Sequence, residues 1–201
     1  MQDQWDIRYA SAEYIYGTEP NQFFANQLSL LAPGKLLLPA DGEGRNAVHA
    51  ARLGWDVHAF DFSGQGRQKA LALAKNSKVS IDYQLASFES YPYQHGYYDA
   101  VALSFVHLPT AQKPSLFNNI TNALKAGGSL VMEAYSKKQL EYKTGGPPVA
   151  DLMYSTSELS TLLQGLDISL LKEEVVELQE GSYHVGKSAV IRVVAHKPGK
   201  A

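Results

Sequence analysis

Cysteine is absent from the 201-residue chain. The chain therefore has no disulfide bond, no thiolate nucleophile and no cysteine-ligated metal site. Long apolar runs are also absent, whereas a membrane-spanning helix needs about 20 predominantly apolar residues. The opening sequence, MQDQWDIRYA, lacks the basic and apolar regions of a signal peptide. We therefore expect a cytoplasmic protein without a membrane partner.

Positive charge is not concentrated anywhere in the sequence. The chain has 18 Lys and Arg residues against 20 Asp and Glu residues, which gives a net charge of -2. A surface that binds nucleic acid needs clustered Lys and Arg to contact phosphates, so we expect no nucleic-acid partner. His107 and His184 stand apart without the spacing of metal ligands, and we expect no metal site.

A stretch of the N-terminal half predicts a strand, a glycine turn, a helix and a second strand in immediate succession. Its sequence is KLLLPADGEGRNAVHAARLGWDVHAFDFS, residues 35–63. Both apolar runs are too short for helices, and Gly54 is a plausible helix stop. The strand, helix and second strand are expected at residues 35–38, 45–53 and 57–60.

Two glycines and an acid lie where these elements meet. Gly42 and Gly44 permit a sharp turn and let a ligand approach the bare backbone. Asp61 ends the second strand, where a carboxylate can accept hydrogen bonds from both ribose hydroxyls of a nucleoside. This arrangement predicts a binding site for a nucleoside cofactor.

The glycine loop discriminates between nucleoside cofactors. Dinucleotide-binding folds use three glycines, because a pyrophosphate sits against the helix N-terminus, and the third glycine is missing here. Glu43 lies inside the loop, where its charge would repel a pyrophosphate. A cofactor with a cationic or zwitterionic arm suits the loop better, and S-adenosylmethionine has such an arm. An NAD(P)-dependent oxidoreductase is the less favoured alternative.

The rest of the chain continues the alternation of strands and helices but ends differently. Further helices are expected between residues 20 and 33 and at 66–74, 114–124 and 157–166, and further strands at 79–85, 98–105 and 129–134. The last two strands, 170–178 and 189–196, follow one another with only the linker 179–188 between them. No helix separates them, which predicts a terminal hairpin.

The segments GEGRN at residues 42–46 and GWDVHAFD at 54–61 resemble the class I S-adenosylmethionine-dependent methyltransferases, in particular the small tellurite-resistance and thiopurine-type enzymes. The similarity covers nearly the whole chain, from Trp5 to Lys197. A terminal antiparallel hairpin is a hallmark of this class. The resemblance implies a Rossmann-like α/β fold, a three-layer sandwich with a seven-stranded, mostly parallel sheet.

The resemblance also implies one domain over residues 1–201, built in three parts. Residues 1–33 would form an N-terminal lid and helix, 35–134 the cofactor-binding core, and 135–201 a substrate-side loop, a short helix and the hairpin. The residues implied to bind the cofactor are Tyr16, Ala40, Asp41, Gly42, Glu43, Gly44, Asn46, Asp61, Phe62, Ser63, Ser87, Phe88, Ser104 and Phe105.

The sequence departs from the family pattern at three positions. Leu38 replaces an acid that helps to hold the methionine ammonium, and Ala40 replaces the first glycine of the loop. The ammonium contact must then come from Asp41 or from a backbone carbonyl. Ser87 stands where the family has an acid that reads the adenine, although its hydroxyl could still pair with the adenine amine. These replacements leave open a non-catalytic module that binds S-adenosylmethionine.

Two histidines are candidate catalytic residues. His107 follows the strand at 98–105, where it is either a general base or a packing and capping residue. His184, in the hairpin linker, is either part of a surface turn or part of a loop that contacts the substrate. A base is needed only if the acceptor must lose a proton. The expected reaction is methyl transfer to a small-molecule acceptor by a monomer or homodimer.

Three segments are candidates for enclosing the methyl group. The tyrosines at positions 9, 14 and 16 are either surface or core aromatics or part of a lid over the cofactor, and the lid is favoured because aromatic faces attract a sulfonium cation. The hairpin linker with His184 is the second segment. The third is the stretch 136–157, which is long and has little periodicity. Such a loop in a compact domain is usually functional or mobile.

Overall fold

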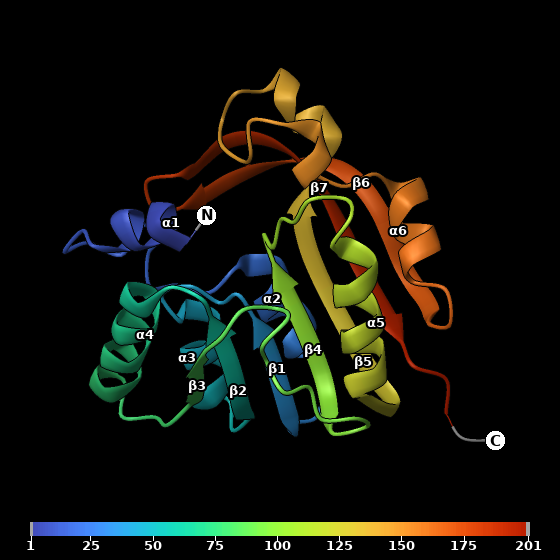
Figure 1. Cartoon of the computed structure of the whole chain (residues 1–201), viewed down its shortest axis with the longest axis horizontal. Coiled ribbons are helices and arrows are strands. Elements are labelled where there is room, and N and C mark those ends of the chain that lie inside the picture. Colours follow the sequence, from blue (N-terminus) through green and yellow to red (C-terminus); the bar gives the residue numbers. More distant parts are fainter. Residues whose placement is uncertain (1, 200–201) are drawn as a thin grey trace. The chain divides into compact units, whose positions relative to one another are not determined.

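The computed structural model describes residues 2–199, and these fall into two compact units. The first unit comprises Met1–Pro92 with Glu180–Tyr183, and the second comprises Tyr93–Gln179 with His184–Ala201. The hairpin turn, residues 180–183, thus belongs to the first unit, whereas residues 167–179 and 184–196 of its two strands, orange to red in Figure 1, belong to the second. That residues 1–201 form one domain stays a prediction.

The first unit alternates parallel strands with helices. Its elements are α1 (Gln2–Tyr9), α2 (Gln22–Leu28), β1 (Lys35–Pro39), α3 (Arg45–Arg52), β2 (Asp56–Asp61), α4 (Gly64–Asn76) and β3 (Asp82–Leu85). β2 pairs in parallel with both β1 and β3. Helix α4 packs against α3, β2 and β3, and α1 packs against α4. The expected strand–turn–helix–strand order is confirmed, and it places the carboxyl ends of β1 and β2 at the same edge.

The second unit combines a parallel pair of strands with the terminal hairpin. Its elements are β4 (Tyr98–Ser104), α5 (Lys113–Ala123), β5 (Leu124–Tyr135), η1 (Lys137–Glu141), η2 (Ala150–Leu152), α6 (Thr156–Leu162), β6 (Asp167–Glu180) and β7 (His184–His196). β4 and β5 are parallel, whereas β7 runs antiparallel to β5. β4 is buried almost throughout, as expected for a central parallel strand.

The strand order of the sheet is β3-β2-β1-β4-β5-β7-β6. A seven-stranded, mostly parallel sheet with an antiparallel C-terminal hairpin is therefore confirmed.

The hairpin strands are longer than the sequence predicted. β6 continues to Glu180 and β7 begins at His184, so most of the expected linker 179–188 is strand. Gly181 and Gly186 have φ angles of 59° and 99°, and both glycines look like turn residues in the sequence. Only Gly181 lies in the turn. Gly186 lies inside the strand that begins at His184, where a glycine can mark a local irregularity. His184 consequently lies in a strand, not in a surface turn.

The segment 136–157 is more ordered than its sequence suggests. It contains the short helices η1 and η2, and Ser136 forms an isolated parallel bridge with Tyr154. Helix α6 is capped by Ser155, whose Oγ accepts the Glu158 N–H at 3.2 Å. The helix expected at 157–166, with Ser157 as its candidate cap, therefore begins one residue earlier and ends at Leu162. Serine caps are hard to place from sequence when two serines stand close together.

Candidate functional site

The glycine loop in the first unit has an unusual backbone. Ala40, Gly42 and Gly44 have φ angles of 51°, 57° and 84°. This left-handed region suits glycine, whereas a residue with a Cβ atom loses roughly 1–2 kcal/mol there. Ala40 therefore occupies a position that favours glycine on backbone grounds. The loop closes on itself where the Gly44 N–H donates to the Asp41 carbonyl at 3.1 Å.

Asp61 connects the end of β2 to this loop. Its Oδ2 accepts the Gly42 N–H at 3.1 Å, and its Oδ1 accepts the Ser63 N–H at 2.8 Å. The side chain is buried, and burial raises its pKa to about 6 although both hydrogen bonds oppose that shift. A carboxylate has about four acceptor positions. Asp61 therefore retains acceptor capacity for ligand hydroxyls.

Two tyrosines hold the loop from other elements. The Tyr83 hydroxyl on β3 donates to the Gly42 carbonyl at 2.7 Å, and burial raises its pKa, so the hydroxyl stays protonated. A Cβ atom added to Gly42 would lie only 2.5 Å from the Tyr9 hydroxyl oxygen. Glycine is thus the residue that fits at position 42. Sequence reasoning missed Tyr83, because a tyrosine on a buried strand looks like a core residue.

Asp41 organises the start of α3. Its carboxylate accepts hydrogen bonds from the Asn46 side-chain amide at 3.0 Å and from the Ala47 N–H at 3.1 Å. Asn46 in turn accepts the Asn21 N–H at 2.9 Å. Burial raises the pKa of Asp41 to about 7 in spite of these contacts. Leu38, which replaces the family acid, is buried in the core.

Glu43 points into the protein rather than into the loop. Its Oε2 accepts the backbone N–H groups of Ile15 at 2.8 Å and Tyr16 at 3.4 Å. Its Oε1 forms an ion pair of 2.7 Å with Lys69 on α4. Glu43 therefore fastens the N-terminal segment to α4, and its charge gives no reason to reject a pyrophosphate.

The hairpin turn is also attached within the first unit. Arg45 forms an ion pair of 2.7 Å with Glu180, and both side chains are largely buried. Arg45 also donates to the Tyr16 carbonyl at 3.3 Å. The Tyr16 hydroxyl accepts from Arg8 at 3.0 Å. Sequence reasoning missed the Arg45–Glu180 pair, because 135 residues separate the two side chains.

The remaining expected cofactor residues of the first unit follow β2 and β3. Ser63 caps α4 by accepting the Gly66 N–H at 3.0 Å, and Phe62 is half-buried. The Ser87 hydroxyl is engaged with Ser90 in a local turn. The Phe88 ring packs edge-on against Phe60, with a distance of 5.8 Å between ring centres.

An aromatic cluster lies in the second unit, just beyond β4. Ser104 ends β4, and Phe105 has a φ angle of 53°. The Phe105 ring lies 4.8 Å from the Tyr135 ring and 4.3 Å from the His184 ring, measured between ring centres. His184 also contacts Tyr135 edge-on. The structure thus brings together Phe105 and His184, which are far apart in the sequence.

His107 lies beside the same cluster. Its Nδ1 atom is 3.0 Å from the carbonyl oxygen of Leu152, and its ring stacks on Tyr135. Because a carbonyl can only accept, Nδ1 carries the hydrogen. Burial lowers the pKa of His107 to about 3 although this hydrogen bond opposes the shift. The ring is neutral near pH 7, and such a weakly basic group is poorly matched to general-base catalysis.

Residues 2–199 contain neither a cluster of metal ligands nor a helix that could cross a membrane. In this range no three His, Asp or Glu side chains are arranged to hold a metal ion. Over the same range, each helix is too short or too polar to cross a membrane.

Replacing Asp61 with Asn should alter the pH dependence of stability. The pKa is about 6 in the folded protein and about 4 in an unfolded chain. The folded state therefore binds more protons between these values, and the wild type loses stability as pH rises through them. We expect urea unfolding to show Asp61→Asn gaining about 1 kcal/mol on the wild type between roughly pH 5 and pH 7.5. A constant difference would mean that the pKa is not raised. Asp167→Asn, at an exposed position, is the control.

The comparisons with known proteins agree with this geometry. A family model described as a methyltransferase domain matches residues 39–128, and no curated protein matches the sequence. Among solved structures, a protein studied for the conversion of a disulfide bond into a thioacetal group during echinomycin biosynthesis is 16% identical. Its TM-score is 0.82, with 100% of this chain and 93% of that chain covered.

Two further structures carry methyltransferase or tellurite-resistance names. TehB from Haemophilus influenzae is 18% identical with a TM-score of 0.73, and 98% of this chain and 66% of that chain are covered. A SAM-dependent methyltransferase from Methanosarcina mazei is 14% identical with a TM-score of 0.71, and 90% of this chain and 100% of that chain are covered. At these identities the likeness concerns the fold. The chain therefore carries a methyltransferase domain, at residues 39–128, and has the fold of the S-adenosylmethionine-dependent methyltransferases.

Proposed function

We propose that this protein transfers the methyl group of S-adenosylmethionine to a small-molecule acceptor. The observation that supports the proposal most strongly is the contact between Asp61 and Gly42 at 3.1 Å. It joins an acid at the end of β2 to a glycine loop at the end of β1. A nucleoside at this edge would have its ribose hydroxyls at the carboxylate and its chain of atoms along the loop backbone.

The charge of the loop favours a cofactor with hydrogen-bond donors and a cation. Burial is the main cause that raises the pKa of Asp41, and the negative charge of Asp61 adds a smaller contribution. Ribose hydroxyls and an ammonium group would relieve this repulsion, whereas phosphates would add to it. We assign to Asp41 the ammonium contact that the family acid would make at position 38.

The chemistry asks for positioning more than for acid–base groups. S-adenosylmethionine supplies a methyl group on a positively charged sulfur, which is already activated. A lone pair of the acceptor forms the new bond to the methyl carbon as the carbon–sulfur bond breaks, and the sulfur becomes neutral. Holding the acceptor in line with that bond can supply much of the acceleration. The residues of this chain would therefore act by binding and orienting.

We assign acceptor binding to the cluster of Phe105, Tyr135, His107 and His184. Its rings pack against one another. Tyr135 and His184 are buried, whereas Phe105 and His107 are half-buried, and these two rings would suit a small apolar or aromatic acceptor. His107 is neutral and its Nε2 atom already accepts the Tyr135 N–H at 3.5 Å, so it would contact the acceptor through its ring rather than remove a proton. The proposal thus favours an acceptor that is nucleophilic without a base, such as a thiolate.

Calorimetry with cofactor products tests the cofactor assignment. S-adenosylhomocysteine should bind with micromolar affinity, roughly -8 kcal/mol, because the loop and Asp61 fit its nucleoside and amino-acid ends. NAD and NADP should give no saturable heat. Saturable binding of NAD together with no binding of S-adenosylhomocysteine would overturn the methyltransferase proposal. Binding without turnover on a broad panel of acceptors would instead support a non-catalytic module.

The roles of the two histidines can be tested by kinetics after an acceptor has been found. Transfer of a labelled methyl group from the cofactor to a panel of candidate acceptors would identify one. His107→Ala and His184→Ala should each lower kcat by about 10- to 100-fold through misplacement of the acceptor, with unchanged affinity for S-adenosylhomocysteine. His95→Ala, at an exposed position in the same unit, should leave both quantities unchanged. Because the His107 pKa is about 3, wild-type kcat should show no ionisation of this residue between about pH 5 and 9. Full activity in both variants would remove the histidines from the site.

A further inference from the structure

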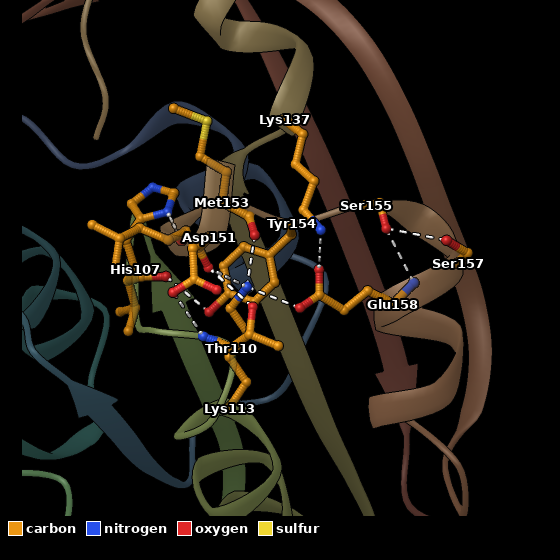
Figure 2. A network of polar contacts seen from close by, with 12 residues as sticks. His107, Thr110, Lys113, Lys137, Asp151, Met153, Tyr154, Ser155, Ser157 and Glu158 are labelled. Atoms are coloured by element: carbon orange, nitrogen blue, oxygen red, sulfur yellow. Dashed lines mark hydrogen bonds and ion pairs between the residues drawn. The ribbon is translucent and has the colours of Figure 1, made fainter. Parts of the chain in front are cut away.

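The second unit buries a lysine ammonium completely. Lys113 is the first residue of α5, and none of its side chain is exposed. Its Nζ atom donates to the carbonyl oxygens of Asp151 at 3.0 Å and Met153 at 2.7 Å. The third contact is an ion pair of 2.9 Å with Oε1 of Glu158. Figure 2 shows the three contacts meeting at one ammonium group.

Stability alone is a weak explanation for this lysine. Removing an ammonium group from water costs several kcal/mol, and well-packed apolar residues are often as stabilising as a buried ion pair. Lys113 directs two contacts to backbone carbonyls and only one to a carboxylate, and its Nζ also lies 4.4 Å from the centre of the Tyr154 ring. Contacts to two carbonyls fix the path of the backbone between them. Lys113 therefore sets the conformation of residues 151–153.

The residue between these two carbonyls contacts His107. The Leu152 carbonyl accepts the Nδ1–H of His107 at 3.0 Å. This contact places the hydrogen on Nδ1 and leaves the lone pair on Nε2, which faces the Tyr135 N–H at 3.5 Å. Thr110 adds a second link to the same segment, since its hydroxyl donates to the Asp151 carbonyl at 3.2 Å (Figure 2). The orientation of the histidine thus depends on a segment that Lys113 holds.

We propose that Lys113 is a positioning residue that holds residues 151–153 so that the Leu152 carbonyl fixes the ring orientation and the Nδ1–H tautomer of His107. This inference rests on the proposed function only in that His107 is assigned to the acceptor. Lys113 touches neither cofactor nor acceptor in this account. Its effect reaches the reaction through Leu152 and His107, because the Nδ1–H tautomer leaves Nε2 as the acceptor of the Tyr135 N–H at 3.5 Å and keeps the ring stacked beside Tyr135.

Nitrogen NMR of the histidine ring tests the inference without any turnover. In the wild type, His107 should show the Nδ1–H tautomer. Lys113→Met keeps an unbranched side chain but removes the ammonium group, and it should populate the Nε2–H tautomer that free histidine prefers. Lys137→Met is the matched control, because Lys137 shares the partner Glu158 at 3.2 Å and serves no other part of the proposal. That variant should keep the wild-type tautomer.

Kinetics of the same variants give the second readout. Lys113→Met should lower kcat by about 10- to 100-fold and leave the affinity for S-adenosylhomocysteine unchanged. An unaltered His107 tautomer in folded Lys113→Met would overturn the inference. If that variant does not fold, the wild-type spectrum decides, and an Nε2–H tautomer there would equally overturn it. Failure of S-adenosylhomocysteine to bind would count against the proposed function, whereas the tautomer result would stand on its own.

Discussion

The hydrogen bond from the Gly42 N–H to Asp61 is the contact on which the proposed cofactor site depends. It joins the glycine loop after β1 to the end of β2 and places the buried Asp61 carboxylate beside the backbone of that loop. The loop around it is held by Tyr83 and covered by Tyr9. Parallel pairing of β1 with β2 makes this meeting possible, since it brings both carboxyl ends to one edge.

The two buried carboxylates beside this contact carry a thermodynamic cost, which the contact itself lowers and which a bound ligand would offset. Burial raises the pKa of Asp61 to about 6 and that of Asp41 to about 7. Each carboxylate therefore destabilises the empty protein when it is ionised. Donors of a bound ligand would stabilise the ionised forms and recover that loss. Sites that bind ligands often keep groups that are unfavourable for stability alone, and this loop fits that pattern.

Local patterns were sufficient to predict the first strand, the glycine turn, the helix and the second strand with Asp61, because these elements lie within residues 35–63. The seven-stranded sheet was implied by the family resemblance, since it pairs strands that are far apart in the sequence, such as β5 and β7. The misplaced features depend on distant contacts. Glu43 seemed to face the cofactor, but it bonds Ile15 and Lys69. His184 seemed to lie in a turn because Gly186 resembles a turn residue, yet a strand begins there. Sequence reasoning missed Lys113, since its three acceptors lie about 40 residues further along the chain.

The most direct test of the account is a thermodynamic cycle between Asp61 and the ribose. The binding of S-adenosylhomocysteine and of its 2′,3′-dideoxy analogue would be measured by calorimetry in the wild type and in Asp61→Ala. The account predicts that loss of the hydroxyls weakens binding to the wild type by about 1.5–3 kcal/mol and has little further effect on the variant. Equal losses in both proteins would contradict it, because the carboxylate would then make no contact with the ribose.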